Sequence, residues 1–393
     1  MNKKKESKVV PNVRFKGFTD DWKQRKLGDD LVSIHTGTNL LGSITNTGMP
    51  LIKMGNIQRG YFDTSKVEFL AENEQPDKAD IANYGDFFFN TRNTLELVGK
   101  GATWMKNSGE YAFNSNIARF ELRNLDTIFF NYLYNTDYMT KQIHARAMGT
   151  TSVAAIYPKT LDSVEYSASC MKEQQKIGTY FKQIDNLITL HQQKITLLTK
   201  LKKAMLEKMF PKKGTVIPEF RFNGFANAWE QRKLSDVVYS VDTGKSKFDK
   251  EGSSGEYPIL GSTSVIGYDD EYDYEGDFIL TARVGANAGS LYRHAGKVKI
   301  SDNTVFIQAS QNIEFLYQLL IRFDIKRLSF GTGQPLVKAS ELKRLELMIP
   351  TNMEEQMRIG VYFKKLDHLI TLHQRKLDML KKLKSACLSE MFI

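Results

Sequence analysis

Two stretches of this chain occur twice, in the same order. Residues 11–30 return as 218–237 with 11 of 20 positions identical, and residues 173–210 return as 355–392 with 23 of 38 identical. The segments between them, 31–172 and 238–354, have almost no sequence in common. The chain is therefore a tandem duplication with a preserved framework and divergent contents. A surface kept alike in both halves suits one partner bound twice, whereas a divergent surface suits two different ligands.

The second repeated stretch has the spacing of a long coiled-coil helix. Alternating intervals of four and three residues continue for more than four heptads. Pro211 and Gly214 end the first helix, and Thr351 with Glu354 predicts a capping box for the second. The predicted seam consists of Ile177, Phe181, Ile184, Ile188, His191, Ile195 and Leu198 in the first copy, and Ile359, Phe363, Leu366, Ile370, His373, Leu377 and Leu380 in the second.

A helix of 38 residues is roughly 57 Å long and cannot be buried alone. We therefore expect the two helices to pack on each other. Repeat symmetry favours an antiparallel pair, and a parallel pair is the alternative. The two seam histidines are interpreted as packing residues rather than as catalytic groups or metal ligands.

The divergent segments have mixed α/β character. Strands are predicted at 86–89, 117–122, 277–280 and 304–308, and helices at 126–147 and 312–328. The expected fold class is α+β: two mixed α/β domains separated by two long helices in an antiparallel coiled coil, as a pseudo-two-fold tandem repeat. The predicted boundaries are 1–165 and 216–347 for the domains, and 166–215 and 348–393 for the helices.

Composition narrows the function classes. A formal net charge of +10 is compatible with a polyanionic partner such as nucleic acid. Cys170 and Cys387 are the only cysteines, so a disulfide framework or a zinc cluster is not expected. The basic start has no apolar run behind it, and no stretch is apolar enough to span a membrane. We expect a soluble cytoplasmic protein with no membrane contact.

Catalytic signatures are not found. Gly244-Lys245-Ser246 resembles the end of a phosphate loop, but Tyr239 occupies the position of its first glycine. The sequence also contains no HExxH zinc motif, no GxSxG nucleophile motif and no tetrapeptide of a base-amino methyltransferase. We therefore predict a binding protein with no catalytic residues, no metal ligands and no cofactor of its own.

Candidate contacts to DNA recur at matching places in both halves. A Gly-Asp-Phe strand is followed by Arg92 in one half and by Arg283 in the other, and arginine at a strand end can contact a phosphate or a guanine edge. A structural salt bridge is the alternative for each arginine, and an ordinary surface loop is the alternative for the rest. The other candidates are Thr38, Asn39, Lys53, Asn56, Gln58, Arg59, Thr151 and Ser152 in the first half, and Lys245, Ser246, Ser262, Thr263, Ser264 and Gln334 in the second.

The doubled motifs resemble those of the specificity subunit of type I restriction–modification enzymes. The first motif reads Arg14-Phe15-Lys16-Gly17-Phe18, then Trp22 and Lys26-Leu27, and returns as Arg221-Phe222-Asn223-Gly224-Phe225, then Trp229 and Lys233-Leu234. The others are the Gly-Asp strands and the openings of the helices, Glu173-Gln174-Gln175-Lys176-Ile177 and Glu355-Gln356-Met357-Arg358-Ile359. One departure is that Asn93-Thr94-Leu95-Glu96 stands where the second half has Gly285-Ala286-Asn287-Ala288-Gly289.

The resemblance implies two target-recognition domains, each reading one half of a split, asymmetric site in double-stranded DNA. It also implies two modification subunits that bind S-adenosylmethionine, and two restriction subunits that use ATP and Mg²⁺. Two other functions remain open. One is a self-contained nuclease or methyltransferase with an unrecognised site, and the other is a coiled-coil scaffold whose divergent domains bind proteins.

Overall fold

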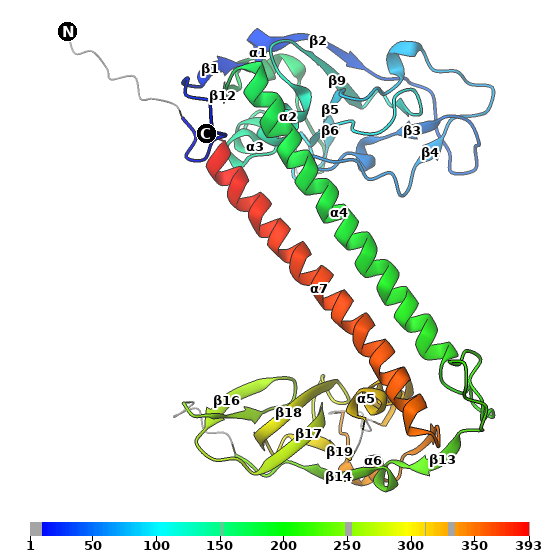
Figure 1. The fold of residues 1–393 in the computed structure, drawn as a ribbon. Coiled ribbons are helices and arrows are strands. Elements are labelled where there is room, and N and C mark those ends of the chain that lie inside the picture. The colour runs from blue at the N-terminus through cyan, green and yellow to red at the C-terminus, as the bar shows by residue number, and fades with distance from the viewer. Residues whose placement is uncertain (1–9, 151, 248–253, 311, 329–334, 393) are drawn as a thin grey trace. The chain divides into compact units, whose positions relative to one another are not determined.

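The structure is a computed structural model that describes residues 10–150, 152–247, 254–310, 312–328 and 335–392. It divides into two compact units. The first consists of Met1–Leu190 with Lys376–Ile393, and the second of His191–Arg375. Each unit therefore joins one divergent domain to a part of both long helices (Figure 1).

The domain of the first unit is built around an antiparallel sheet of order β2-β9-β5-β7. Its strand β5 is buried on both faces, because Phe87 and Phe89 pack on α2 while Phe88 packs in a smaller core with Trp104. Smaller sheets have the orders β1-β12, β4-β3-β8 and β10-β11-β6. The strands are β1 Lys23–Lys26, β2 Leu31–Thr36, β3 Pro50–Ile52, β4 Glu68–Phe69, β5 Phe87–Asn90, β6 Arg92–Asn93, β7 Gly101–Thr103, β8 Ala112–Phe113, β9 Ile117–Leu122, β10 Met148–Gly149, β11 Ala154–Ala155 and β12 Glu165–Ala168; the helices are α1 Leu27–Asp30, α2 Thr127–Tyr134 and α3 Asp137–His144.

The domain of the second unit has a larger sheet of order β14-β19-β17-β18-β15-β16, in which β15 and β18 are parallel. Ile279 on β17 packs with α5 in the main core, whereas Phe278 and Leu280 face a second core. A separate pair joins β13 to β20. The strands are β13 Glu230–Lys233, β14 Val238–Thr243, β15 Tyr257–Leu260, β16 Val265–Asp269, β17 Tyr274–Ala282, β18 Leu291–Ile300, β19 Thr304–Ala309 and β20 Glu346–Ile349; the helices are α5 Ile313–Phe323 and α6 Ala339–Lys343.

The long helices are α4, Met171–Lys208, and α7, Met353–Met391. Their contacts run antiparallel in each unit. In the first unit Asp185 accepts a hydrogen bond from Lys384 at 2.6 Å, and in the second Lys202 donates to Asp367 at 2.6 Å. The two ion pairs are equivalent, because Asp185 and Lys202 of the first repeat match Asp367 and Lys384 of the second, 182 residues later. Every predicted seam residue is buried or half-buried, and the His191 and His373 rings face each other with their Nδ1 atoms 2.9 Å apart.

The end of each long helix completes the core of the domain that belongs to the other repeat. Phe392 is 8% exposed and packs on Trp22, Phe129 and Phe181 in the first unit. Its counterpart Phe210 is 1% exposed in the core of the second unit, which also contains Trp229, Phe315 and Phe363. The two repeats thus exchange helix ends.

The backbone beside these helix ends is tied to the start of each domain by one repeated hydrogen bond. Val13 N donates to Glu390 O at 3.0 Å in the first unit. Phe220 N donates to Lys208 O at 2.9 Å in the second. Residues 208 and 220 are joined by a short continuous segment, whereas residues 390 and 13 are far apart in sequence. The same backbone contact is therefore made at both junctions.

Each start motif is fixed to its own long helix by a buried ion pair. Arg14 binds Glu173 through two hydrogen bonds of 2.6 and 2.8 Å, and Arg221 binds Glu355 through two of 2.6 and 2.7 Å. Both carboxylates are inaccessible to solvent, with 0% of each residue exposed. Because a buried carboxylate is costly without a partner, the repeated arginine is required wherever the repeated glutamate is kept.

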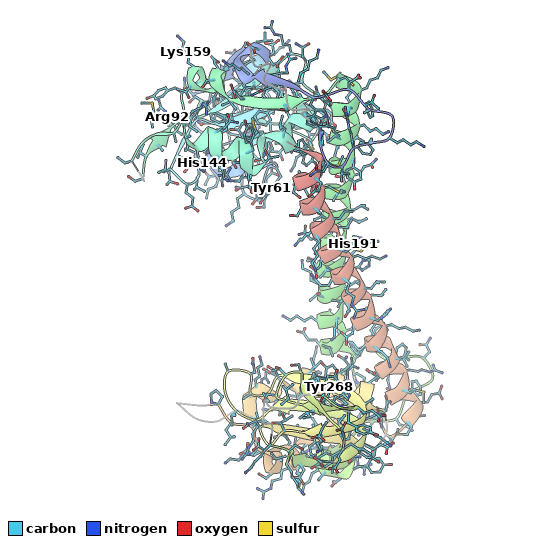
Figure 2. The ribbon with its side chains drawn as sticks, turned by 90° about the vertical axis from the view of Figure 1, so that its left-hand side faces the viewer. Tyr61, Arg92, His144, Lys159, His191 and Tyr268 are labelled. Carbon is cyan, nitrogen blue, oxygen red and sulfur yellow. The ribbon has the colours of Figure 1, made fainter. Side chains whose placement is uncertain are left out.

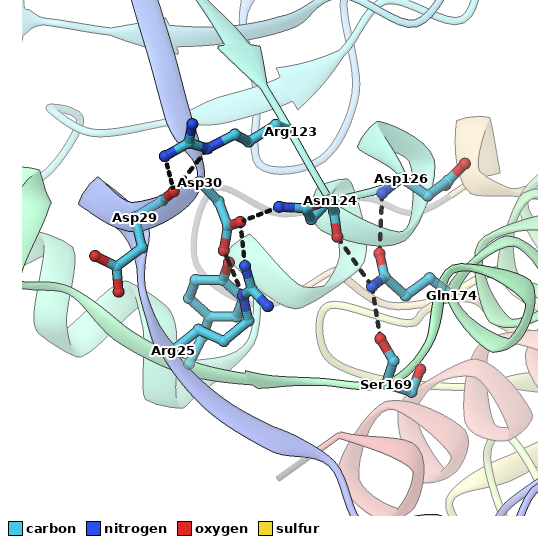
Figure 3. A network of polar contacts seen from close by, with 9 residues as sticks. Arg25, Asp29, Asp30, Arg123, Asn124, Asp126, Ser169 and Gln174 are labelled. Atoms are coloured by element: carbon cyan, nitrogen blue, oxygen red, sulfur yellow. Dashed lines mark hydrogen bonds and ion pairs between the residues drawn. The ribbon is translucent and has the colours of Figure 1, made fainter.

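A second polar network occurs in the first unit, where β1, α1 and β12 meet (Figure 3). The buried Asp30 accepts hydrogen bonds from Arg25, Tyr166 and Asn124. Burial alone raises the pKa of Asp30, but these three donors outweigh it and hold the pKa below the ordinary value of 3.8. At the start of α4, the Gln174 amide accepts from Asp126 N and donates to the backbone carbonyls of Asn124 and Ser169.

The four predicted strands are confirmed, as β5, β9, β17 and β19. The single helix predicted over 126–147 is wrong, because it divides into α2 and α3 at Asn135, where Thr136 caps α3 by accepting from Met139 N. The helix predicted over 312–328 ends early, because Asp324 adopts a left-handed conformation with φ of 62° before a 3₁₀ turn. The predicted cap at Thr351 is also wrong, since Asn352 accepts the hydrogen bond from Glu354 N.

Candidate nucleic-acid interface

In the first domain, Arg92 lies on a strand that pairs with the segment leading to α4. β6 pairs antiparallel with β11, with Arg92 opposite Ala155 and Asn93 opposite Ala154. β11 in turn pairs with β10, and Ser152 is exposed in the turn that joins these two strands. Thr151 lies outside the described residues. The structure therefore brings Arg92 and the predicted hairpin residue Ser152 into one small sheet.

Arg92 is exposed, and its guanidinium has no hydrogen bond or ion pair with any of the residues that the structure describes. Figure 2 shows its side chain at the outer edge of the first domain. The alternative of a structural salt bridge thus finds no partner for Arg92 in the described part of the chain. An exposed, unpaired guanidinium remains able to contact a phosphate or a base edge.

The second domain has a similar arrangement in which the arginine is shifted by one residue, because Arg283 makes the backbone hydrogen bonds that Thr91 makes in the first domain. Val337 N donates to Arg283 O at 2.8 Å, and Gly285 N donates to Pro335 O at 3.1 Å. Arg283 is exposed, and no described residue pairs with its side chain. Gln334 lies outside the described residues. In both domains, therefore, an arginine beside the segment that leads to a long helix is presented to solvent.

The loop after each start motif approaches the backbone of a neighbouring segment closely. A Cβ added to Gly37 would lie 2.0 Å from Phe113 O, and one added to Gly244 would lie 2.3 Å from Ile300 O. Only glycine fits at these two positions. Asn39 and Lys245, which follow these glycines in the two loops, are exposed.

Several predicted contacts are occupied within the protein. Thr38 is 8% exposed, and its hydroxyl accepts from Leu40 N. Asn56 is 7% exposed; its amide accepts from Lys53 N and donates to the carbonyls of Asp63 and Lys66. These two side chains stabilise their loops, and we leave them out of the proposed contact surface.

Other predicted residues are half-buried and engaged, or fully exposed. Lys53 pairs with Glu68, and Ser246 donates to Asp273 at 2.6 Å. Ser262 donates to Asn303 O at 3.1 Å, and Gln58 to Gly55 O at 2.8 Å. The predicted residues that the structure leaves exposed are Asn39, Arg59, Arg92 and Ser152 in the first domain, and Lys245, Thr263, Ser264 and Arg283 in the second.

Three basic residues that the sequence did not single out lie near Arg59. His144 Nε2 is 3.0 Å from the Arg59 guanidinium, and Lys100 donates to the Gln58 amide at 2.8 Å. Lys141 lines the same surface pocket as Arg59 and His144. Together with Arg59 these residues come from three segments of the chain, so no local spacing could have revealed them.

Among the described residues, no group of three or more His, Cys, Asp or Glu side chains is arranged to hold a metal ion. No described helix is long and apolar enough to cross a membrane.

Comparison with known proteins gives one consistent family. The type I restriction modification DNA specificity domain matches residues 19–200 and 227–382. The chain is 22% identical over 408 residues to the type I restriction enzyme MjaVIII specificity subunit of Methanocaldococcus jannaschii, covering 93% of this chain and 90% of that protein. It is 22% identical over 351 residues to the StySPI specificity subunit of Salmonella potsdam, covering 79% and 73%. The solved S subunit from M. genitalium superposes with a TM-score of 0.68 at 15% identity, over 98% of this chain and 99% of that chain, and so shares the fold.

Proposed function

The chain belongs to the type I restriction–modification DNA specificity family, and we propose that each of its two target-recognition domains reads one half of a split, asymmetric site in double-stranded DNA. A specificity subunit is not itself an enzyme. One observation carries the proposal: each domain presents an exposed arginine without a described partner beside the segment that leads to a long helix, surrounded by loops that differ between the domains. Equal frameworks with unequal loops suit two different half-sites.

We further propose that two modification subunits, which bind S-adenosylmethionine, dock on the repeated framework, and that two restriction subunits using ATP and Mg²⁺ join them. The support is an exposed apolar patch that occurs once in each unit. The patch consists of Leu187, Leu190, Met379 and Leu383 in the first unit, and of Leu369, Leu372, Leu197 and Leu201 in the second.

The two patches correspond residue by residue under the repeat, and their members are 36% to 67% exposed. Exposed apolar side chains that gather into a patch are a recognised mark of a protein contact site. Two equal patches suit two copies of one partner. The proposed role also places the protein in the cytoplasm, where its DNA substrate is found.

The decisive experiment is a domain exchange. Residues 238–345 are replaced by the second recognition domain of another family member, and the host genome is sequenced with detection of methylated adenine. We expect one half of the modified sequence to change while the other half and the presence of a gap persist. A change in both halves would show that the domains do not read separately.

Two further measurements separate the proposal from its alternatives. A self-contained enzyme requires turnover by the purified chain with DNA, Mg²⁺ and labelled S-adenosylmethionine, and we expect none. A protein-binding scaffold requires no salt-dependent DNA affinity even with partner subunits present, whereas we expect a steep dependence.

The patches are tested by Leu197→Glu on α4 and Met379→Glu on α7, with Thr199→Glu, at an exposed position of α4, as the charge-matched control. Each patch variant should lose co-purification of one of two modification subunits, because a buried carboxylate without a partner is costly. The control should retain both. Full retention by the patch variants would rule out docking at this surface.

A further inference from the structure

Arg59 is presented by a rigid turn. Ile57 and Phe62 form a bridge across the turn, and Gln58 N donates to Tyr61 O at 2.9 Å. Gly60, the residue after Arg59, is held on both sides, because its N donates to Gly101 O and its carbonyl accepts from the Asn131 amide, each at 3.0 Å. The backbone that carries the exposed guanidinium is thus fixed to β7 and α2.

The turn borders a surface pocket of about 540 Å³. Arg59 and two residues of α3, Lys141 and His144, contribute its basic lining, and Asn135, Asp137 and Thr140 complete most of the remainder. Lys100 lies near the same guanidinium: burial lowers the pKa of Lys100, and the neighbouring positive charge of Arg59 lowers it further. No ion pair joins Arg59, Lys100 or Lys141 to a carboxylate within the described part of the chain.

The Arg59–His144 contact fixes the protonation state of the imidazole. A guanidinium has only donors, so the His144 Nε2 that faces it must accept and therefore carries no proton. Burial lowers the pKa of His144, and the charge of Arg59 adds to this effect. The basic side chains at the pocket can therefore donate hydrogen bonds to a bound anion, beside the carboxylate of Asp137 in the same lining.

Two short segments of the chain connect the surroundings of the pocket to the sheet that carries Arg92. β6 leads through residues 94–98 to Gly99 and Lys100, and Gly99 N and Asn90 O are hydrogen bonded at 3.0 Å. On the other side, α3 ends at His144, four residues before β10.

We propose that Arg59, Lys100 and His144 together bind one phosphate group of the DNA backbone beside the half-site that the Arg92 strand contacts. The proposal rests on the proposed function and deepens it, since it assigns a contact that sets affinity and register rather than base choice. The phosphodiester accepts from Arg59 and Lys100 and releases His144 Nε2 from Arg59. The imidazole then takes up a proton and donates to the same phosphate.

The test measures binding of the full-length chain, with its modification subunits, to a long duplex of random sequence as salt is varied. The variants are Arg59→Gln and Lys100→Gln, with Lys159→Gln as control. Lys159 is exposed on the same domain, and in Figure 2 it lies on the side away from Tyr61. The control removes the same charge from outside the pocket, and a thermal melt of each variant excludes unfolding.

Removal of one phosphate contact should lower the slope of log affinity against log salt by about 0.9. The loss for Arg59→Gln and for Lys100→Gln should therefore be about 3.5-fold larger at about 50 mM salt than at about 200 mM. Lys159→Gln should leave the slope unchanged. If Arg59→Gln and Lys100→Gln have the same slope as Lys159→Gln, the proposed phosphate site is ruled out. The domain exchange can still give its expected result in that case. Absence of DNA binding by the wild type overturns the proposed function itself.

His144→Gln gives a second readout. A group that gains a proton on binding strengthens binding at low pH and loses this contribution as the pH rises through the bound-state pKa. The charged neighbours, Arg59 on the turn, Lys100, Glu96, and Asp137 with Lys141 on α3, are unchanged in this variant. The wild type should therefore bind more tightly at about pH 6 than at about pH 8 by a margin that His144→Gln lacks. Identical pH profiles would show that His144 takes up no proton from solvent when DNA binds.

Discussion

The exchange of helix ends predicts that each half of the chain stabilises the domain of the other. Phe392→Ala removes a side chain that is 8% exposed and contacts three aromatic rings, with centroids 5.4 Å away for Phe129, 5.7 Å for Phe181 and 6.4 Å for Trp22. Removal of a buried phenylalanine side chain costs about 3–5 kcal/mol. We take about 3 kcal/mol, because a residue just past a helix end can relax.

The assay is hydrogen exchange measured by mass spectrometry on peptides from each unit. A loss of about 3 kcal/mol lowers protection by about two powers of ten. We expect the loss in β5 of the first unit for Phe392→Ala and in β17 of the second unit for Phe210→Ala. Leu383→Ala is the control on the same helix, since Leu383 is 43% exposed. Loss of protection in β17 rather than β5 on changing Phe392 would refute the exchange.

Four other substitutions test three separate parts of the structure. Arg92→Gln and Arg283→Gln should each reduce discrimination by about 1–3 kcal/mol at one half-site only, as competition with duplexes scrambled in either half would show. Asp30→Asn should lower the free energy of unfolding by about 2 kcal/mol at neutral pH. Because the pKa of Asp30 is lowered in the folded state, the wild type's advantage is present above about pH 3.8 and disappears as the pH falls through the lowered pKa. Denaturation at several pH values can follow this loss. Gly178→Ala should destabilise by about 1–3 kcal/mol in thermal melts, since the new Cβ would lie 2.8 Å from Phe129 N, whereas alanine at an open helix position would stabilise.

The long helices were predictable because their pattern is local. Their four-three spacing continues over the whole repeated stretch, and it is the signature of residues buried along one side of a helix. The break between α2 and α3 was missed because apolar residues continue across it. Thr136 with Asp137 carried the signal, as a helix cap followed by an acidic first turn.

The surface was less predictable than the framework. Thr38 and Asn56 have side chains suited to base contacts, yet they are buried and bonded to backbone, which depends on how residues far apart in sequence meet. The same applies to the surroundings of Arg59, where Lys100 and His144 come close only after folding. Residue type identified the chemistry, whereas accessibility required tertiary structure.

The matched hydrogen bonds from Val13 to Glu390 and from Phe220 to Lys208 have a consequence for gene architecture. Because the two junctions are alike, the order in which the domains are encoded is not dictated by the fold. A permuted gene that opens the chain within residues 211–217 and joins residue 392 to residue 11 through a seven-residue linker of that type should encode the same two units. New specificities could therefore arise by shuffling halves between genes, with no need to invent a new framework.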